Sequence, residues 1–358
     1  MQFGLSYCVF LELEQSMLQK TKERTYLFDN IKAILIFLVV ACHFLKIGGS
    51  FDPASAGGFF YLVSFSFIMQ GFIFISGYFS KNTLKCRQGA VKSFLIPYLV
   101  LMPIMYFIRL LLFGKARFLL YLPTHSLWFL LVLFAYRYWL HDLKQVRKIG
   151  WISLLSFFIS GCIPFFGEPL ALGRIFSYFL FFYVGFLFQW KDIERIRAIG
   201  KPYIFGLLAL LTGLSVYLTR SQLLHEDAWQ MKYPGYLYGM SISQGLASRL
   251  LILLVSCGWL VVLFSLIPNR KLPFSGIGRH TMTIFVFQIP VRYLVKKFSL
   301  PGHDNLLTYG SCLLLSFLVV YVFSRPSIEN LYNKSMDAVY RHLWVPVADI
   351  LKKKFQHA

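Results

Sequence analysis

Long runs of apolar residues, interrupted by short polar and basic segments, recur along the whole chain. A transmembrane helix needs about 20 predominantly apolar residues to cross the hydrocarbon core of a bilayer. Ten runs approach this length, and we expect each to be a membrane-spanning helix. They lie approximately at residues 31–47, 59–79, 92–113, 125–140, 149–166, 171–190, 202–219, 246–267, 281–299 and 306–323. The fourth run is the weakest, because it is short and contains Arg137.

The basic residues between these runs predict the orientation of the chain. When the connecting segments are assigned alternately to two sides, 23 of the 36 Lys and Arg residues fall on the side of the N-terminus, eight fall on the opposite side, and five lie within or at the edges of the runs. Cytoplasmic loops of membrane proteins carry an excess of Lys and Arg. We therefore expect an all-α, polytopic membrane protein with about ten transmembrane helices and both termini in the cytoplasm.

The composition excludes most other classes. Of the 358 residues 57% are hydrophobic and only 14% are charged, which is atypical of a soluble or a disordered chain. A net charge of +21 would suggest nucleic acid as the partner of a soluble protein. Here the charge lies in loops between spans, so we expect a membrane lipid environment and no nucleic acid. The six cysteines are scattered without a CxxC spacing, which gives no indication of a disulfide framework or a metal site.

Three segments follow from this pattern. Residues 1–24 are expected to be a cytoplasmic N-terminal segment, in which 1–16 fit either a dispensable extension or a start-site error, because Met17 opens a more ordinary cytoplasmic start. Residues 25–324 are expected to form the membrane domain. Residues 325–358 alternate apolar and charged positions and predict an amphipathic cytoplasmic tail. The longest outer loop, 220–245, mixes aromatic and polar residues, which fits an outer binding surface or a plain interfacial loop.

The first run places ionisable residues where they are costly. An ionisable side chain in a span costs about 2.5–3.5 kcal/mol on insertion scales and needs a partner, a watery cavity or a function. Asp29, Lys32 and His43 follow one another at offsets of three and eleven, which returns all three to one helix face. A lone His can also be a packing residue, and this spacing by itself leaves that alternative open.

The same residues carry a resemblance to a known family. The run RTYLFDNIKAILIFLVVACHF resembles the first span of the acyltransferase 3 family, whose mark is an Arg or Lys followed after ten residues by His; Lys32 and His43 match it. The runs FIMQGFIFISGYFSK, KSFLIPYL, SLWFLLVLF and FLFFYVGFLF resemble later stretches of the family, particularly its fucose 4-O-acetylase-like branch, over most of residues 24–300. One position departs from the pattern. Relatives often end the stretch matching GIGRHTMTIFVFQIP on His, where this chain has Gln288, whose amide suits hydrogen bonding to an acceptor sugar better than proton transfer.

The resemblance implies an enzyme of the plasma membrane that moves an acyl group, usually acetyl, from cytoplasmic acyl-CoA to a hydroxyl of a surface polysaccharide or lipid-linked sugar. His43 would be the general base for that hydroxyl or a transient acyl acceptor. Asp29 is expected to pair with Lys32. The CoA phosphates would be held by cations at the inner side, although topology alone also places basic residues there: Lys32, Lys81, Lys85, Arg87 and Lys92.

The acceptor would bind at the outer mouths of the fourth to sixth spans. Trp128 is expected to stack on a sugar ring while Glu168 and His125 hydrogen-bond its hydroxyls, with Arg174 nearby. Anchoring at the membrane interface explains Trp128 equally well.

Two other classes compete with this interpretation. A secondary transporter or flippase for a glycan or lipid intermediate also suits ten spans with buried polar residues, but such proteins often contain matching halves, and no internal symmetry is visible in this sequence. A structural or receptor-like membrane protein would leave His43 without a role.

Overall fold

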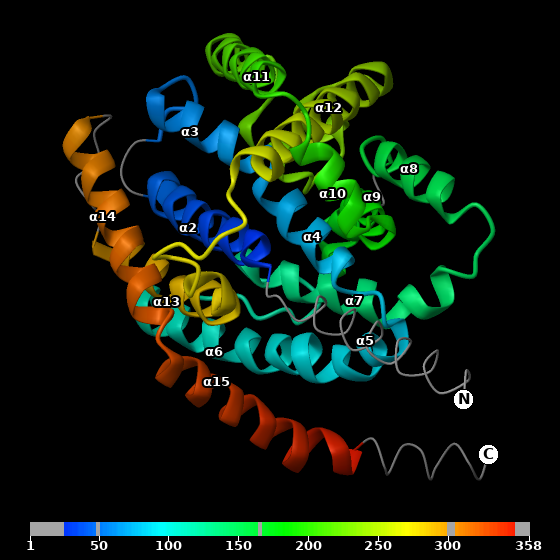
Figure 1. Cartoon of the computed structure of the whole chain (residues 1–358). Coiled ribbons are helices and arrows are strands. Elements are labelled where there is room, and N and C mark those ends of the chain that lie inside the picture. The colour runs from blue at the N-terminus through cyan, green and yellow to red at the C-terminus, as the bar shows by residue number, and fades with distance from the viewer. Residues whose placement is uncertain (1–24, 48–50, 164–166, 299–304, 348–358) are drawn as a thin grey trace, which may run out of the picture.

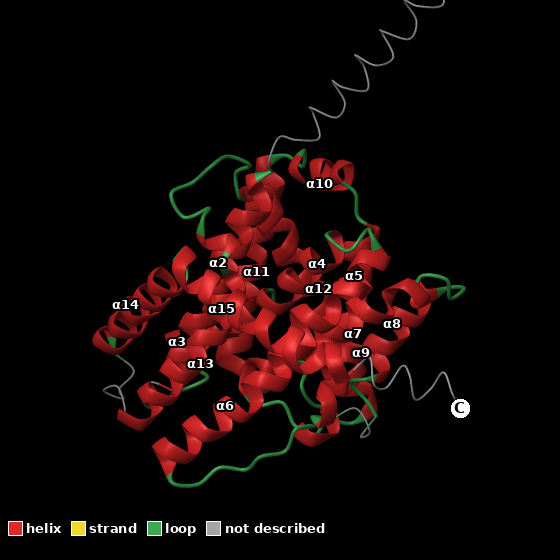
Figure 2. Cartoon of the chain, turned by 90° about the horizontal axis from the view of Figure 1, so that it is seen from below, coloured by secondary structure: helices red, strands yellow, loops and turns green. Residues whose placement is uncertain are grey.

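The computed structural model describes residues 25–47, 51–163, 167–298 and 305–347, and these form helices joined by loops, with no strand among them (Figure 1 and Figure 2). The helices are α2 (Tyr26–Ile47), α3 (Ala56–Phe65), α4 (Ile68–Tyr78), α5 (Thr83–Ala90), α6 (Ile96–Phe113), α7 (Trp128–Leu143), α8 (Ile149–Ile159), α9 (Leu172–Leu187), α10 (Trp190–Arg197), α11 (Lys201–Ser221), α12 (Ile242–Leu266), α13 (Thr281–Phe298), α14 (Leu306–Phe323) and α15 (Pro326–Val339). The expectation of an all-α membrane protein is confirmed. Residues 1–24 and the end of the tail after 347 lie outside the described residues.

Seven helical segments within the described residues are long and apolar enough to cross a membrane. They are Tyr26–Ile47, Ala56–Tyr78, Thr83–Phe113, Pro169–Leu187, Lys201–Ser221, Ile242–Leu266 and Leu306–Phe323. The other three predicted spans fall on α7, α8 and α13. Helices α7 and α8 have 16 and 11 residues, fewer than the roughly 20 that a crossing requires. The last turn of α13 is basic. The count of ten crossings therefore remains a prediction.

The second and third predicted spans have internal structure that their apolar composition did not indicate. The second is divided into α3 and α4, because Phe67, between them, leaves the helical conformation with φ −140° and ψ −16°. The third begins with a π-helical turn, Val91–Leu95, that joins α5 to α6 without a break. An apolar run specifies burial along its length but not where a helix is interrupted.

The predicted cytoplasmic segments contact one another at one end of the bundle. The backbone N–H of Leu27 donates to Asn269 Oδ1 at 3.0 Å. Arg197 donates to the carbonyl oxygen of Ile267 at 2.6 Å. Lys92 Nζ lies 2.8 Å from Asp337 Oδ1. Segments that alternation assigns to one side are therefore neighbours in space.

The predicted outer segments likewise contact one another at the opposite end. Lys46 Nζ lies 2.6 Å from Asp227 Oδ1. The N–H of Gly57 donates to the Tyr309 hydroxyl at 3.0 Å, linking α3 to α14. The N–H of Gly235, in the outer loop, donates at 2.7 Å to the carbonyl oxygen of Gly161, which follows the end of α8 within the fifth predicted span. Which of the two ends faces the cytoplasm remains a prediction from the distribution of Lys and Arg.

Helices α2 and α4 lie in the middle of the bundle (Figure 1). Helix α2 contacts α3, α4, α12, α13 and α14. Helices α4 and α9 pack with their backbones in close approach at Gly77 and Gly185. A Cβ at Gly77 would lie 2.0 Å from the Phe182 carbonyl oxygen, and one at Gly185 would lie 2.1 Å from that of Phe74. Small residues permit this approach where the hydrophobic effect drives helix association only weakly.

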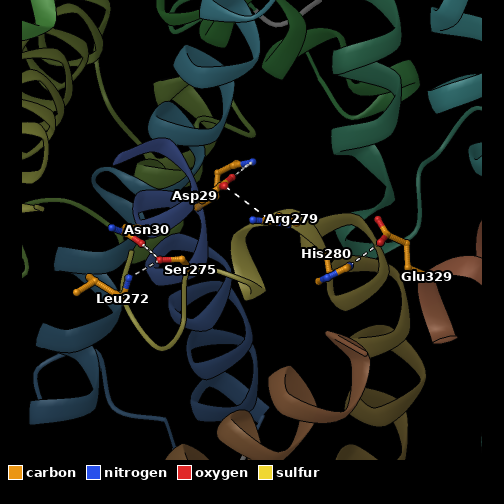
Figure 3. Close-up of polar contacts among 8 residues, drawn as sticks. Asp29, Asn30, Leu272, Ser275, Arg279, His280 and Glu329 are labelled. Atoms are coloured by element: carbon orange, nitrogen blue, oxygen red, sulfur yellow. Dashed lines mark hydrogen bonds and ion pairs between the residues drawn. The ribbon is translucent and has the colours of Figure 1, made fainter. Parts of the chain in front are cut away.

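The N-terminal end of α2 is held by the segment that leads from α12 to α13 (Figure 3). The Asn30 side-chain amide donates to the carbonyl oxygens of Pro268 and Arg270, both at 2.9 Å, and accepts from the Ser275 hydroxyl. Arg279 Nε lies 3.9 Å from Asp29 Oδ2. These contacts fix the rotation of α2 and therefore the direction in which its polar face points.

The predicted tail is helical where the structure describes it. Helix α15 follows α14 directly, and at its start His280 Nδ1 lies 2.5 Å from Glu329 Oε2 (Figure 3). Tyr332 and Met336 are buried, whereas Leu331 and Leu343 are exposed. An exposed apolar side is what binding to a membrane surface needs, and this location remains a prediction.

Candidate functional site

One face of α2 lines two cavities. The cavity at the outer end, hereafter the outer cavity, has a volume of about 400 Å³, and the cavity toward the inner end, the inner cavity, has about 320 Å³. Lys32, Ile36 and Val39 line the inner cavity, and Val39, His43 and Lys46 line the outer one. Their offsets of four, three, four and three are those of a single helix face. The shared face predicted from the sequence is thus a wall common to two cavities.

The two cavities meet at an apolar boundary. Val39, Met69 and Phe285, from α2, α4 and α13, line both of them. His43 follows Val39 by one helical turn, about 6 Å along the axis. A molecule that extends beyond this boundary from the inner cavity therefore reaches the vicinity of His43.

His43 is hydrogen-bonded to a side chain that the sequence analysis did not single out. Its Nε2 lies 3.0 Å from the Ser126 hydroxyl oxygen. Ser126 is 5% exposed and lies in the turn His125–Leu127 at the start of α7. His125, immediately before it, has φ of 45°, a left-handed conformation that is uncommon for a residue other than glycine. A strained backbone conformation of this kind persists only where the surrounding structure holds it in place, and such conformations are common at functional sites.

Four of the five predicted acceptor residues line the outer cavity together with His43: His125, Trp128, Glu168 and Arg174. The Trp128 ring stacks on the Tyr178 ring with centroids 5.6 Å apart. The Arg174 guanidinium lies 4.3 Å from the centroid of the Trp128 ring. Trp128 therefore packs within a stack of protein side chains, and its contact with a sugar remains a prediction.

Gln288 lies apart from this group. It is fully buried on α13, its amide donates to the carbonyl oxygen of Phe285 at 3.3 Å, and it lines neither the outer nor the inner cavity. Arg292, one helical turn after Gln288 on α13, does line the outer cavity.

The loop 220–245 contributes side chains to the outer cavity, as one of the two sequence interpretations expected. Asp227, Gln230 and Lys232 line it. The Gln230 amide donates to the Tyr61 hydroxyl at 2.6 Å and to Asp227 at 2.9 Å. The composition of the loop indicated a binding surface but not which side chains turn inward, since those depend on contacts with α2 and α3.

Glu168 and Lys232 form an ion pair at the rim of the outer cavity. Partial burial raises the pKa of the Glu168 carboxyl, but the hydrogen bond and charge of Lys232 outweigh it, so the pKa lies below its ordinary value of 4.5. Glu168 is therefore a carboxylate at neutral pH and suits hydrogen-bond acceptance rather than proton donation.

The inner cavity contains two cations. Lys32 Nζ lies 3.1 Å from Asp29 Oδ1, the partner expected from their spacing. Arg137, in α7, donates to the Ser76 hydroxyl at 3.3 Å, and its guanidinium lies 5.3 Å from the centroid of Phe94. Arg137 had appeared in the sequence only as a weakness of the fourth span. A charged residue inside a predicted span is itself an indication of function, and this indication could have singled out Arg137 from the sequence.

The other four cations expected to bind CoA do not line the inner cavity. Lys81 donates to the carbonyl oxygens of Phe186 and Phe188, and Arg87 pairs with Asp142. Burial lowers the pKa of Lys81. Lys92 pairs with Asp337, and Lys85 is exposed. The sequence placed these residues on one side of the membrane, but only Lys32 of the five is directed into the cavity.

No group of His, Cys, Asp and Glu that could hold a metal ion occurs in the part of the chain that the structure describes. The two cavities together bring a histidine, a carboxylate and several cations to one helix face and its neighbours in a helical membrane protein. A family model described as an acyltransferase domain matches residues 26–325, and the chain belongs to this acyltransferase 3 family. It is a membrane acyltransferase. Comparison with curated proteins gives no match, and comparison with solved structures gives none.

Proposed function

We propose that the protein is an O-acetyltransferase that moves an acetyl group from cytoplasmic acetyl-CoA to a hydroxyl of a cell-surface polysaccharide or lipid-linked sugar. The observation that carries this proposal is the single face of α2 on which Lys32 lines the inner cavity and His43 the outer one. A donor and an acceptor that enter from opposite ends would meet beside His43.

The donor would enter through the inner cavity. Lys32 and Arg137 supply positive charge there, and the remaining lining is mainly apolar, which suits an acyl chain or a pantetheine arm. The distance along α2 from Lys32 to His43 is about 16 Å by helical rise. An extended pantetheine arm could cover such a distance and bring the thioester past Val39 to His43.

The acceptor hydroxyl would enter the outer cavity. His43 Nε2 is a base when it is unprotonated, and the Ser126 hydroxyl can donate to it in that form. As the sugar oxygen attacks the thioester carbonyl, the hydroxyl proton passes to His43. The C–S bond then breaks, and His43 returns this proton to the sulfur, so that CoA leaves as the thiol and the imidazole is again unprotonated. A positioned base of this kind contributes about 10² to 10⁴ in rate.

The test is transfer of radiolabelled acetyl from acetyl-CoA to glycans in membranes that contain the wild type or His43→Gln. An amide can replace a packing hydrogen bond but cannot take up the proton. We expect His43→Gln to accumulate normally and to lose at least about a hundredfold in transfer.

His141→Gln provides a matched control. His141 also bonds to a hydroxyl, since its Nδ1 lies 3.0 Å from Thr83 Oγ1, but it lines neither cavity. This variant is expected to keep its activity. Near wild-type transfer by His43→Gln would make His43 a structural histidine and would refute the proposed mechanism.

A further inference from the structure

The outer cavity adjoins a second hollow that is lined by basic residues. This hollow, hereafter the basic groove, has a volume of about 590 Å³ and shares Arg109, His125 and Arg292 with the outer cavity. Its charged lining residues are Arg109, Lys115, Arg117, Arg292 and Lys296, and no carboxylate lies among the described residues that line it.

No counter-charge for the cations of the groove is found among the residues that the structure describes. Among the described residues the structure gives none of the five an ion pair or a side-chain hydrogen bond. In the adjoining outer cavity, by contrast, both carboxylates are already paired, Asp227 with Lys46 and Glu168 with Lys232. Like charges gathered in a hollow repel one another, and a cleft lined by one sign of charge concentrates ligands of the opposite sign.

The position of these cations runs against the general distribution of charge in the chain. Eight basic residues fall in the predicted outer segments, and six of them line the outer cavity or the basic groove: Lys46, Lys115, Arg117, Arg174, Lys232 and Lys296. The orientation of the chain in the membrane does not explain these outer basic residues, because the residues that set orientation are Lys and Arg on the cytoplasmic side. Arg109 and Arg292 are placed within the predicted third and ninth spans, where a charge is costly unless it has a function.

We infer that the acceptor is an anionic glycan, whose carboxylate or phosphate groups bind the basic groove while the hydroxyl to be modified enters the outer cavity beside His43. This inference rests on the proposed function and specifies its substrate class. Arg binds carboxylate and phosphate with paired, charge-assisted hydrogen bonds. Arg109, His125 and Arg292 line both hollows, so a ligand in the groove would lie next to the outer cavity.

The test is binding of defined anions to the full-length protein in nanodiscs of zwitterionic lipid, without acetyl-CoA. The probes are trigalacturonate and a neutral trisaccharide, for carboxylated glycans, and farnesyl diphosphate and farnesol, for diphosphate-linked lipid glycans. We expect one of the two anionic probes to bind more tightly than its neutral counterpart, with an affinity that falls as the salt concentration rises. Which anion binds identifies the source of the negative charge.

Matched variants locate the binding site. Arg117 lines the groove, whereas Arg220 is an exposed arginine at the outer end of α11 that lines neither the groove nor the outer cavity. Lys115→Gln with Arg117→Gln should weaken anion binding about tenfold, Arg117→Gln alone should weaken it less, and Arg220→Gln should leave it unchanged.

Three results would overturn the inference. If the neutral and anionic probes bind with equal affinity, or if none of them binds, charge does not select the acceptor. Binding of phosphatidylglycerol in place of both anionic probes would make the groove a lipid site. A higher KM for acetyl-CoA in the Lys115 and Arg117 double variant would assign the groove to the donor. Because the binding test uses no donor, its failure is separate from that of the His43 transfer test.

Discussion

His43 Nε2 and the Ser126 hydroxyl oxygen lie 3.0 Å apart, and this hydrogen bond joins α2 to the start of α7. Under the proposed mechanism an acceptor hydroxyl would give its proton to this same ring nitrogen. When the Ser126 hydroxyl donates to Nε2, the ring proton is held on the other nitrogen, so under the proposed mechanism Ser126 would orient the base before the acceptor arrives.

We expect Ser126→Ala to lower kcat for acetyl transfer about tenfold, because the imidazole loses its orienting partner while it can still take a proton. The KM for acetyl-CoA should change little. Ser126→Thr, which keeps the hydroxyl, should recover much of the rate. The measurement is steady-state transfer by all three proteins. Loss of activity in Ser126→Ala as complete as in His43→Gln would mean that the serine takes part in the chemistry itself.

Lys32→Ala should raise the KM for acetyl-CoA by about five- to tenfold and leave kcat nearly unchanged, because a charge that holds the donor is lost. Lys32→Arg should be milder. Arg87→Ala is the comparison, since Arg87 bonds to Asp142 and to the Tyr138 carbonyl oxygen outside the inner cavity. Kinetics at varied donor concentration measure both effects. A larger KM change in Arg87→Ala than in Lys32→Ala would indicate that the CoA phosphates bind at α5 and not in the inner cavity.

The Glu168–Lys232 pair should make stability depend on acidic pH. Because the pKa of Glu168 in the folded protein is below its ordinary value of 4.5, its contribution is complete above pH 4.5 and disappears as the pH falls toward the lowered pKa. The pair is partly exposed, so the contribution should be under about 1 kcal/mol. The difference in melting temperature between wild type and Glu168→Gln should be constant near neutrality and shrink below pH 4.5. A difference that grows in acid would contradict this pairing.

Labelling of introduced cysteines tests the orientation, after the six native cysteines have been replaced. A cysteine at Asp52, in the exposed segment before α3, should react with an impermeant thiol reagent added outside the cell. A cysteine at Gln145, in the exposed segment between α7 and α8, should react only after the membrane is opened. The reverse labelling pattern would show that the protein has the opposite orientation in the membrane and that the basic groove faces the cytoplasm.

The sequence by itself determined the class of the fold and one wall of the site. Apolar composition and helical periodicity are local properties, so they were sufficient for an all-helical membrane protein and for the common face of Lys32 and His43. The resemblance to a family added the acyltransferase activity. Positions 125, 128, 168 and 174 were singled out because they lie at the mouths of spans; they line the outer cavity, and their contact with an acceptor remains a prediction.

Only the tertiary structure decided which of these residues meet. Ser126 is 83 positions from His43, and Arg109 and Arg292 come from helices α6 and α13, so no local pattern relates them. The sequence placed five cations at the inner side, but the rotation of each helix, set by packing such as that of Asn30 against the 268–275 segment, directs only Lys32 into the cavity. Side-chain direction depends on the neighbours that a helix packs against, and those neighbours are distant in the chain.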